Sequence, residues 1–534
     1  MAEYFRRLAS HAAHDRLAIV DPVSSKSSTP GQHSYAQLLL RVNVFHEKLT
    51  AAAQEARRPI EGARVGLMVP PGVDFIAALL AIWSVKAIVV PICLTHPLQE
   101  ITHTVTDSGQ DFIIYHGDFE RQIRPLIQTR SCIDVTTIPR EARSRDVSIT
   151  NINPWSAETP CTIIYTSGTT GLPKGAILSA KNLEFSFRSL ADTWQLTCED
   201  RVLHVLPLHH GHGLTLSLLL PLWAGATVEF MAKFNEKLVW ERFLSTSLHP
   251  VTVFMAVPTI WVKMIAYFNQ NFKSHPAKAK RATEAAASLR LAISGSAALP
   301  APIRDAWAQI SNGYLLLERY GTTETGITYS ERLSPNGRVH GSVGWPLPGV
   351  QARLITAEGQ DVTNIPDVMG EIQIKSDGLM KEYWGKPGAA EKDLTEDGWW
   401  RTGDLALIKA EHGNATFIQG RASVDIIKSG GYKISGLDIE TEMLQLPYVQ
   451  EVAVVGVPDT VWGEAVAAIC VPVQGKDAEL TIANIRENLK SRLASYKLPK
   501  KLFVMKELPR NAMGKVQKKA LRERCFPRPR ETKL

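Results

Sequence analysis

The sequence has few cysteines, and they lie far apart. No CxxC pair occurs among its 534 residues, and its six cysteines stand at positions 93, 132, 161, 198, 470 and 525. A disulfide framework or a zinc ribbon needs cysteines at close, regular spacing. We therefore expect reduced and mostly buried thiols.

Long hydrophobic runs are also missing. The longest, Phe75 to Val90 and Leu214 to Trp223, are interrupted by Lys86 and Pro221. Both fall short of the ~20 apolar residues that a membrane span needs. We expect core helices here and no membrane span. Residues 1–20 lack the serine-rich character of a transit peptide and are expected to form the first helix of the fold.

The composition excludes several classes of protein. The chain is 45% hydrophobic and 21% charged, with no internal repeat or low-complexity tract, which is typical of a globular protein of several domains. A net charge of +7 spread over this length is weak support for nucleic-acid binding, and no such motif occurs. It does suit small anionic substrates such as ATP and coenzyme A. The oligomeric state is left open.

A glycine- and hydroxyl-rich segment indicates phosphate binding. Residues 165–175 read Tyr-Thr-Ser-Gly-Thr-Thr-Gly-Leu-Pro-Lys-Gly and follow an apolar run. Glycines let backbone N–H groups approach an anion, while hydroxyls donate hydrogen bonds and lysine adds charge. The segment lacks the GxxxxGK[ST] spacing of a Walker loop, and Pro173 would disrupt a following helix. The candidate phosphate-binding residues are Thr166, Ser167, Gly168, Thr169, Thr170 and Lys174.

Alternation of short apolar runs with helical patterns predicts parallel α/β layers over the first two thirds of the chain. Two glycine turns follow predicted strands, one at Gly295-Ser296-Ala297 and one at Gly321. Ligands gather at the carboxyl ends of parallel strands, so both turns are expected at a site. The expected strands span 65–69, 87–92, 112–115, 162–165, 202–206, 227–230, 251–257 and 291–294.

The pattern changes near Gly370 to closely spaced strands at 371–375, 405–408 and 415–419, which predicts an antiparallel β subdomain. A boundary near Gly420-Arg421 then separates residues 1–420 from a small α/β domain of residues 421–534. The predicted fold is thus a large N-terminal domain of layered α/β subdomains with an antiparallel β subdomain, followed by a small mobile domain.

Six segments in order resemble the adenylate-forming enzymes, the family of acyl-CoA synthetases, firefly luciferase and peptide synthetase adenylation domains. One alone could be an ordinary turn, but their order over most of the chain carries the resemblance. After the phosphate-binding segment come Leu206–Gly213, Tyr320–Glu324, Trp400–Asp404, Gly420–Arg421 through Gly430–Lys433, and Pro509–Lys515.

The resemblance implies a two-step reaction in which a carboxylate attacks the α-phosphorus of ATP and a thiol then displaces AMP. Lys174 would hold the pyrophosphate, Thr323 the α-phosphate and Asp404 the ribose. Glu324 would ligate Mg²⁺, a cation that prefers carboxylate oxygen. We assign catalytic roles to Lys515, Glu324 and His210. The resemblance also places nucleotide contacts at Gly295, Ser296, Ala297, Tyr320, Gly321, Thr322 and Arg421.

The resemblance further implies that the small domain turns about a hinge near Asp425. One orientation would present Lys515 for adenylation, and the other would present Gly430, Gly431 and Tyr432 to the arm of coenzyme A. From charges alone, Lys515 could instead belong to a solvated basic face and Asp425 could be a surface acid. Glu324 and Asp404 could likewise be a loop acid and a turn cap.

Arg319 narrows the choice of carboxylic acid. The resembled family commonly carries a small residue at this position, which lines the acyl pocket. An unpaired buried charge costs about 3–5 kcal/mol, which a second carboxylate on the substrate would relieve. Strand alternation puts Glu318 on the opposite face, so Glu318 is not expected to pair with Arg319. His212 could bind the same anion, and Arg290 and Ser294 are weaker candidates. A distant acid could instead neutralise Arg319.

These features resemble the malonyl-CoA synthetase-like acyl-CoA ligases, so malonate or a substituted malonate is the expected acid. Threonine at 322, where such relatives usually have methionine, indicates a wider pocket that could take a substituted malonate or another acid. The alternative substrate is a medium-chain or aromatic acid. Alternatives are transfer to a carrier protein, amino-acid activation and a silent nucleotide-binding scaffold. Because only a short segment follows Lys515, we expect no fused carrier domain.

Two further expectations concern metals and location. His209, His210 and His212 could hold zinc, but adjacent histidines rarely give tetrahedral spacing and a fourth ligand is needed. The final residues, Thr532-Lys533-Leu534, are a relaxed version of the SKL peroxisomal address. The expected compartment is the cytoplasm, with the peroxisome as the alternative.

Overall fold

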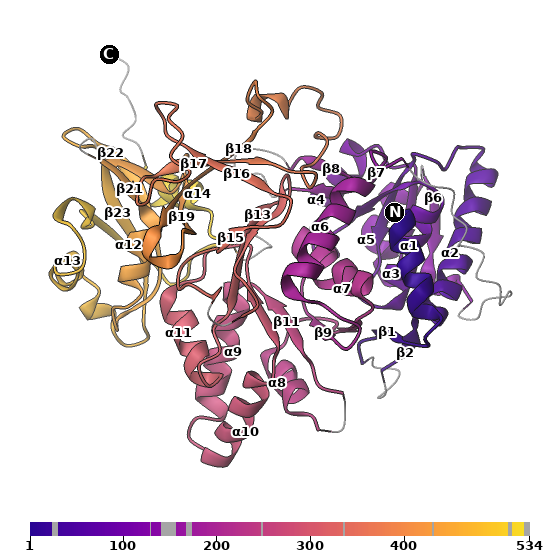
Figure 1. Cartoon of the computed structure of the whole chain (residues 1–534), viewed down its shortest axis with the longest axis horizontal. Helices are drawn as coiled ribbons and strands as arrows, with labels where there is room; N and C mark the ends of the chain where they lie inside the picture. Colours follow the sequence, from indigo (N-terminus) through magenta and orange to yellow (C-terminus); the bar gives the residue numbers. More distant parts are fainter. Residues whose placement is uncertain are drawn as a thin grey trace.

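A computed structural model describes residues 1–23, 30–128, 130–139, 156–166, 173–246, 249–334, 337–429, 432–510 and 515–527. Strands of these residues form four sheets (Figure 1). We name them the N-terminal, central, antiparallel and C-terminal sheets. All six cysteines are outside disulfides, as expected. No helix among the described residues is long and apolar enough to cross a membrane.

The N-terminal sheet has the order β6-β5-β3-β4-β7-β8, parallel except for the β7–β8 hairpin. Its buried, nearly all-apolar strands are typical of a parallel sheet covered on both faces. The strands are β3 (Arg64–Met68), β4 (Ile88–Pro91), β5 (Phe112–Tyr115), β6 (Ser131–Asp134), β7 (Pro160–Tyr165) and β8 (Gly175–Ser179).

The central sheet has the order β15-β14-β13-β12-β11-β9-β10-β1-β2, with parallel pairing from β13 to β1 and antiparallel pairing at both ends. The carboxyl ends of β12 and β13 therefore lie side by side. Its strands are β1 (Leu17–Val20), β2 (Gln32–Ser34), β9 (Arg201–His204), β10 (Thr227–Phe230), β11 (Val253–Ala256), β12 (Leu291–Ser294), β13 (Leu317–Thr322), β14 (Gly326–Ser330) and β15 (Trp345–Pro346).

The two remaining sheets belong to the last third of the chain. The antiparallel sheet contains β16 (Gln351–Ile355), β17 (Gly370–Lys375), β18 (Trp400–Lys409) and β19 (Ala415–Arg421). The C-terminal sheet contains β20 (Ile426–Ser429), β21 (Tyr432–Ser435), β22 (Val449–Asp459), β23 (Gly463–Pro472) and β24 (Lys501–Val504). The chain passes from one to the other between Arg421 and Ile426, close to the predicted boundary.

Helices cover the sheets, and Figure 1 shows α8 to α11 gathered beside the central sheet and α12 to α14 around the C-terminal sheet. They are α1 (Ala2–Ala12), α2 (Tyr35–Ala56), α3 (Val73–Ser84), α4 (Leu98–Asp107), α5 (Glu120–Ile127), α6 (Ala180–Trp194), α7 (Leu220–Ala224), α8 (Glu236–Leu244), α9 (Pro258–Asn271), α10 (Pro276–Ala287), α11 (Ala301–Ile310), α12 (Gly436–Met443), α13 (Ile482–Leu489) and α14 (Lys518–Cys525). A π-helix, His212–Leu219, precedes α7.

The predicted first helix over residues 1–20 is wrong in its second half. The helix ends at Ala12, and Leu17–Val20 form β1, which pairs with β10. This pairing joins segments far apart in sequence, so local pattern could not reveal it. The run Phe75 to Val90 is likewise a helix followed by a strand, because the chain turns at Lys86, which has a left-handed φ of 56°.

A buried charge network fixes the back of β13. Arg304, on α11, is fully buried, and its Nη1 and Nη2 atoms lie 3.0 Å from Glu318 and 3.3 Å from Glu331. Burial, partly offset by Arg304, raises the pKa of Glu318 to about 8. Glu318 therefore faces Arg304 and not its sequence neighbour Arg319, as strand alternation predicted.

Candidate functional site

A cavity of about 1930 Å³ lies where the central, antiparallel and C-terminal sheets meet. It receives most of the residues proposed from the sequence, from segments throughout the chain. Those lining it are Thr166, Lys174, His210, His212, Ser296, Ala297, Arg319, Tyr320, Gly321, Thr322, Thr323, Glu324, Asp404, Arg421, Asp425 and Lys515.

The phosphate-binding segment connects the β7–β8 hairpin, whose last pair joins Tyr165 to Gly175. The chain continues into a strand and not into the helix of a Walker loop. The N–H of Thr166 donates to the carbonyl of Lys174 at 2.8 Å, and the Lys174 ammonium lies 4.9 Å from the ring centre of Tyr383. The candidates Ser167, Gly168, Thr169 and Thr170 lie outside the described residues.

Glu324 follows β13 and is held from two sides. The Tyr383 hydroxyl donates to its Oε1 atom at 3.0 Å, and its own carbonyl accepts the N–H of Met380 at 2.7 Å. Asp393 lies nearby, and burial together with Glu324 raises its pKa, while Lys174 acts in the opposite sense. This end of the cavity thus brings the Lys174 ammonium together with the carboxylates of Glu324 and Asp393.

Asp404 forms the centre of a second polar group in the cavity. It is buried, and its carboxylate accepts hydrogen bonds from the Tyr320 hydroxyl at 2.6 Å and from the Arg421 Nε atom at 3.0 Å. Each carboxylate oxygen has a second lone pair, so capacity for ligand hydroxyls remains. At Gly321 an added Cβ would lie 2.0 Å from the carbonyl oxygen of Gly326, so only glycine fits this turn.

Lys515 comes to the same cavity from the C-terminal end of the chain. It keeps solvent access, yet its pKa is lowered, first by burial and then by repulsion from Arg421 and Arg319. Asp404 and Glu324 act in the opposite sense. Lys515 thus lies within electrostatic reach of the site residues, which argues against the interpretation that it belongs only to a solvated basic face.

Arg319 is buried in the cavity wall, and no described residue compensates its charge. Its Nε and Nη2 atoms make no hydrogen bond with any described residue, and no described acid forms an ion pair with it. Burial is what lowers the pKa of Arg319, to about 10, so the guanidinium is still charged at neutral pH. Within the described residues, the alternative of a structural ion pair fails.

His212 and Ser296 lie beside this guanidinium. The Nδ1 atom of His212 is 3.1 Å from the Ser296 hydroxyl, while its buried Nε2 atom has no partner among the described residues. Burial, and then repulsion from Arg319, lowers the pKa of His212 far below its usual value, so the ring is neutral. In the tautomer whose Nδ1 accepts from the Ser296 hydroxyl, the ring proton is on Nε2, where an anion can accept it.

Gly295 allows the arginine to lie where it does. A Cβ added at Gly295 would stand 2.5 Å from both Cζ and Nε of Arg319. The next residue, Ser296, has a left-handed φ of 68°, a strained conformation that is common at binding sites. The turn after β12 is therefore shaped around the guanidinium.

We expect Gly295→Ala to raise the KM for the carboxylic acid about tenfold or more, because the methyl group must push the guanidinium aside. The KM for ATP should change by less than about twofold. Steady-state kinetics with each substrate varied in turn measures both. Gly313→Ala is the control for backbone strain alone: Gly313 has a left-handed φ of 89°, which disfavours alanine, but no described atom lies within 4 Å of an added Cβ there, so both KM values should stay unchanged. A rise in both KM values alike would contradict this arrangement.

His210 lines the cavity and packs on His209, with ring centres 4.0 Å apart. Burial, followed by repulsion from His96 and Lys515, lowers the pKa of His210 to about 4. A neutral imidazole next to Lys515 suits hydrogen bonding better than charge neutralisation. A catalytic role for His210 stays a prediction.

Two substrate candidates do not reach the acid pocket. Arg290 precedes β12 at the end opposite the site and binds the buried Asp200 through two contacts of 3.0 and 2.7 Å. Its guanidinium is already neutralised, so the proposal that it binds a substrate carboxylate is wrong. Ser294 is buried at the end of β12 and does not line the cavity, although its hydroxyl has no partner among the described residues.

The proposed hinge residue is not a surface acid. Asp425 lies 2.6 Å from the Lys518 ammonium, which also contacts Glu440 at 2.7 Å, and it accepts the N–H of Arg421 at 3.0 Å. Tyr432 stacks on Tyr496 with ring centres 4.2 Å apart and lies away from the cavity lining. Gly430 and Gly431 are outside the described residues.

Tyr383 and Asp393 were missed from the sequence. Both line the cavity beside Glu324 and Lys174, but neither belongs to a segment that suggested phosphate or metal chemistry. A tyrosine and an aspartate in a loop carry no spacing signal of their own. Only their contacts in space identify them.

Comparisons with known proteins identify the family of this chain. The AMP-binding enzyme family matches residues 5–384, and the AMP-binding enzyme C-terminal domain matches residues 438–515. The protein named malonate–CoA ligase ACSF3, mitochondrial, of Xenopus laevis is 36% identical over 96% of this chain and 90% of its own length.

Solved structures give the same result. ATP-bound MatB from Rhodopseudomonas palustris has a TM-score of 0.84 and 29% identity, with 98% of each chain covered. A malonyl-CoA ligase complex with methylmalonyl-CoA and AMP has a TM-score of 0.63 and 30% identity, covering 93% of this chain and 98% of its own. The predicted architecture is confirmed by these likenesses.

Proposed function

The chain belongs to the AMP-binding enzyme family, and we propose that it joins malonate or a substituted malonate to coenzyme A. It is an AMP-forming acid–thiol ligase, with a carboxylic acid, ATP and coenzyme A as its substrates. The observation that carries the choice of acid is the buried guanidinium of Arg319, which pairs with no acid in the described part of the chain.

A diacid fits this pocket because each of its carboxylates has a separate task. Arg319 would bind one carboxylate through its planar fork, with the Nε2 proton of His212 as a further donor. The other carboxylate then points toward the nucleotide. A monocarboxylic acid would leave the guanidinium uncompensated at a cost of about 3–5 kcal/mol. The relatives named for malonate and methylmalonate support the same acids.

The first half-reaction forms one bond and breaks one. A carboxylate oxygen attacks the α-phosphorus, the bond from that phosphorus to the bridging oxygen breaks, and pyrophosphate leaves. Lys174 would bind the departing phosphates and Asp404 the ribose hydroxyls, with Thr323 at the α-phosphate. Lys515 would neutralise the negative charge that builds between carboxylate and phosphate. In the second half-reaction, the thiol attacks the acyl carbon, AMP leaves, and the thiol proton passes to solvent.

Mg²⁺ is part of this proposal. Glu324 lines the cavity, and Tyr383 donates to its Oε1 atom, so Oε2 is the oxygen that could serve as a hard ligand. When bound there, the cation would offset charge on the phosphate oxygens. Asp393 is close enough to influence Glu324 and to be influenced by it.

Domain movement is also proposed. The predicted units, 1–420 and 421–534, would turn near Asp425, and coenzyme A would then meet Gly430, Gly431 and Tyr432. For the compartment we expect the cytoplasm, with the peroxisome as the alternative; Thr532-Lys533-Leu534 lie outside the described residues.

A substrate panel tests the choice of acid. Pyrophosphate release is measured with malonate, methylmalonate, acetate, a medium-chain acid and an aromatic acid, with and without coenzyme A. We expect kcat/KM for the better of malonate and methylmalonate to exceed kcat/KM for acetate by about 100-fold or more. Preference for a monocarboxylic acid would reject the proposed substrate and leave the reaction class intact. Methylmalonate as a good substrate would agree with threonine at 322.

A further inference from the structure

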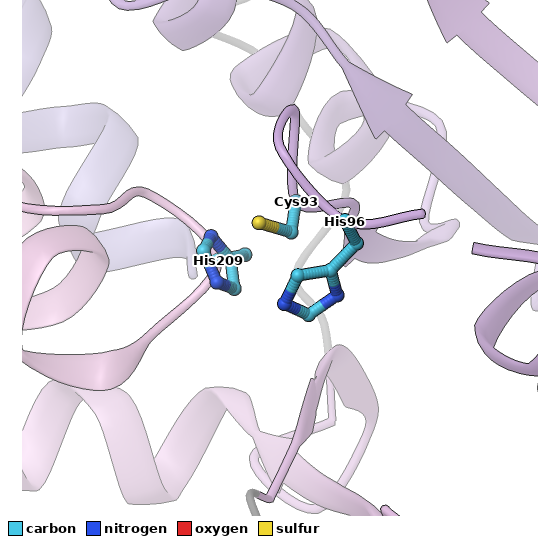
Figure 2. Close-up of side chains that lie close together, drawn as sticks. All are labelled: Cys93, His96 and His209. Atoms are coloured by element: carbon cyan, nitrogen blue, oxygen red, sulfur yellow. The ribbon is translucent and has the colours of Figure 1, made fainter. Parts of the chain in front are cut away.

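Three side chains that the ligase chemistry does not use converge next to the cavity. One ligand atom from each of Cys93, His96 and His209 lies within 4.8 Å of the others. Figure 2 shows the thiol and the two imidazole rings facing one another from two separate segments. Cys93 and His96 follow β4 of the N-terminal sheet, while His209 follows β9 of the central sheet.

We propose that Cys93, His96 and His209 form a binding site for a thiophilic divalent cation such as Zn²⁺. A thiolate and two imidazoles are ligands that zinc prefers, and three protein ligands leave a fourth tetrahedral position for water. Metal–ligand bonds of about 2.0–2.3 Å require ligand atoms somewhat closer than here, within reach of small side-chain rotations. Binding would release the thiol proton to solvent.

The surroundings of His96 support this site. Its Nδ1 atom lies 3.2 Å from a carboxylate oxygen of Glu100, which leaves Nε2 as the nitrogen for a metal. A carboxylate on the far nitrogen of a metal-bound histidine fixes the ring and strengthens it as a ligand. Glu100 lies in the first turn of α4 and His96 just before the N-cap of that helix, four residues earlier, so local geometry holds this pair.

His209 is also available as a metal ligand. Its ring lies at 5.4 Å from that of His96, with 70° between the planes, and its buried Nε2 atom has no hydrogen-bond partner among the described residues. A buried polar atom left without a partner normally carries a cost. Neither His210 nor His212 belongs to the cluster, so it differs from the zinc site that the three neighbouring histidines suggested.

The occupied site would join two sheets. A cation held by both segments would connect the turn after β4 to the segment after β9, whose His210 packs on His209 at the cavity wall. A ligand that binds only the folded state raises thermal stability. Metal binding should therefore be visible without any measurement of ligase activity.

The full-length chain is titrated with Co²⁺ as a spectroscopic substitute and then with Zn²⁺, and bound metal is counted by mass spectrometry of the element. We expect one equivalent per chain, a thiolate-to-cobalt charge-transfer band, and a rise of a few degrees in the melting temperature with Zn²⁺. Cys93→Ser and His209→Gln should each weaken binding at least about tenfold and remove or alter the band. Glu100→Gln should weaken binding about tenfold and keep the band.

Cys132→Ser is the control, because it makes the same substitution at a thiol of intermediate exposure that belongs to no ligand group found in the described part of the chain. It should bind metal as the unmodified chain does. Absence of the band, or equal affinity in Cys93→Ser, would overturn the site. Should Cys93→Ser fail to fold, the rate of alkylation of Cys93 is measured in the unmodified chain with and without Zn²⁺, and this rate tests the site. Zn²⁺ must slow labelling of Cys93 and leave labelling of Cys132 unchanged, and equal rates with and without Zn²⁺ would reject the proposal.

Discussion

Replacing Arg319 by glycine should lower kcat/KM for malonate by about 10²–10³-fold, since a buried charge pair to the substrate is lost. The KM for ATP should change by less than about threefold, because no contact of Arg319 with the nucleotide group around Asp404 exists among the described residues. Pyrophosphate release with malonate or ATP varied measures both. Relative to malonate, acetate and propionate should become better substrates than they are for the unmodified chain, because the variant has no buried guanidinium that a monocarboxylic acid would leave uncompensated.

Two companion variants sharpen this test. Arg319→Lys keeps the charge but lacks the planar fork, so its loss for malonate should be intermediate. Arg332→Gly makes the same substitution at an exposed arginine that lies over Trp345, and it should leave both substrates unaffected. Equal losses for malonate, acetate and ATP in Arg319→Gly would mean that this arginine supports the fold and does not select the acid.

Replacing Lys515 by alanine should reduce the adenylation half-reaction by about 10²–10³-fold, the usual effect of removing one group that stabilises transition-state charge. Lys515 is placed for this task, because it lines the cavity close enough to Arg319, Arg421 and Asp404 for their charges to shift its pKa. Single-turnover formation of the adenylate, measured by rapid quench, gives the rate.

The second half-reaction separates this role from general damage. With malonyl adenylate supplied, thioester formation by Lys515→Ala should stay within about threefold of the unmodified rate. Lys519→Ala is the control, since Lys519 is exposed on α14 and belongs to the same basic run. An equal loss of rate in both half-reactions, or a loss of rate in Lys519→Ala as well, would mean that Lys515 belongs to a solvated basic face and has no specific role in adenylation.

Strands with simple apolar runs could be predicted from the sequence. The strands β5, β10 and β12 begin and end where predicted, because buried parallel strands read as short hydrophobic runs. By contrast, β1 was assigned to a helix and β14 was not predicted. Their pairing partners lie elsewhere in the chain or in polar motif segments, so local pattern carries little signal.

Some residues of the candidate site could likewise be predicted from the sequence, and others could not. Arg319 was recognisable because a cation stood where relatives have a small residue, and the structure leaves it unpaired among the described residues. Arg290 was misjudged, because its partner Asp200 is distant in sequence and pairs with it only in the fold. Tyr383, Asp393 and the group of Cys93, His96 and His209 depend on contacts between separate sheets, which no spacing rule describes.

The buried network of Arg304, Glu318 and Glu331 has a consequence for how selectivity can change. Two neighbouring residues of β13 differ in their surroundings: Glu318 binds Arg304 behind the strand, whereas Arg319 lines the cavity in front, where we propose that it selects the acid. Position 319 can therefore be retuned, in evolution or by design, while its anchor stays in place. Enzymes on this framework could diverge toward new acids by single exchanges at that position, with little penalty in folding.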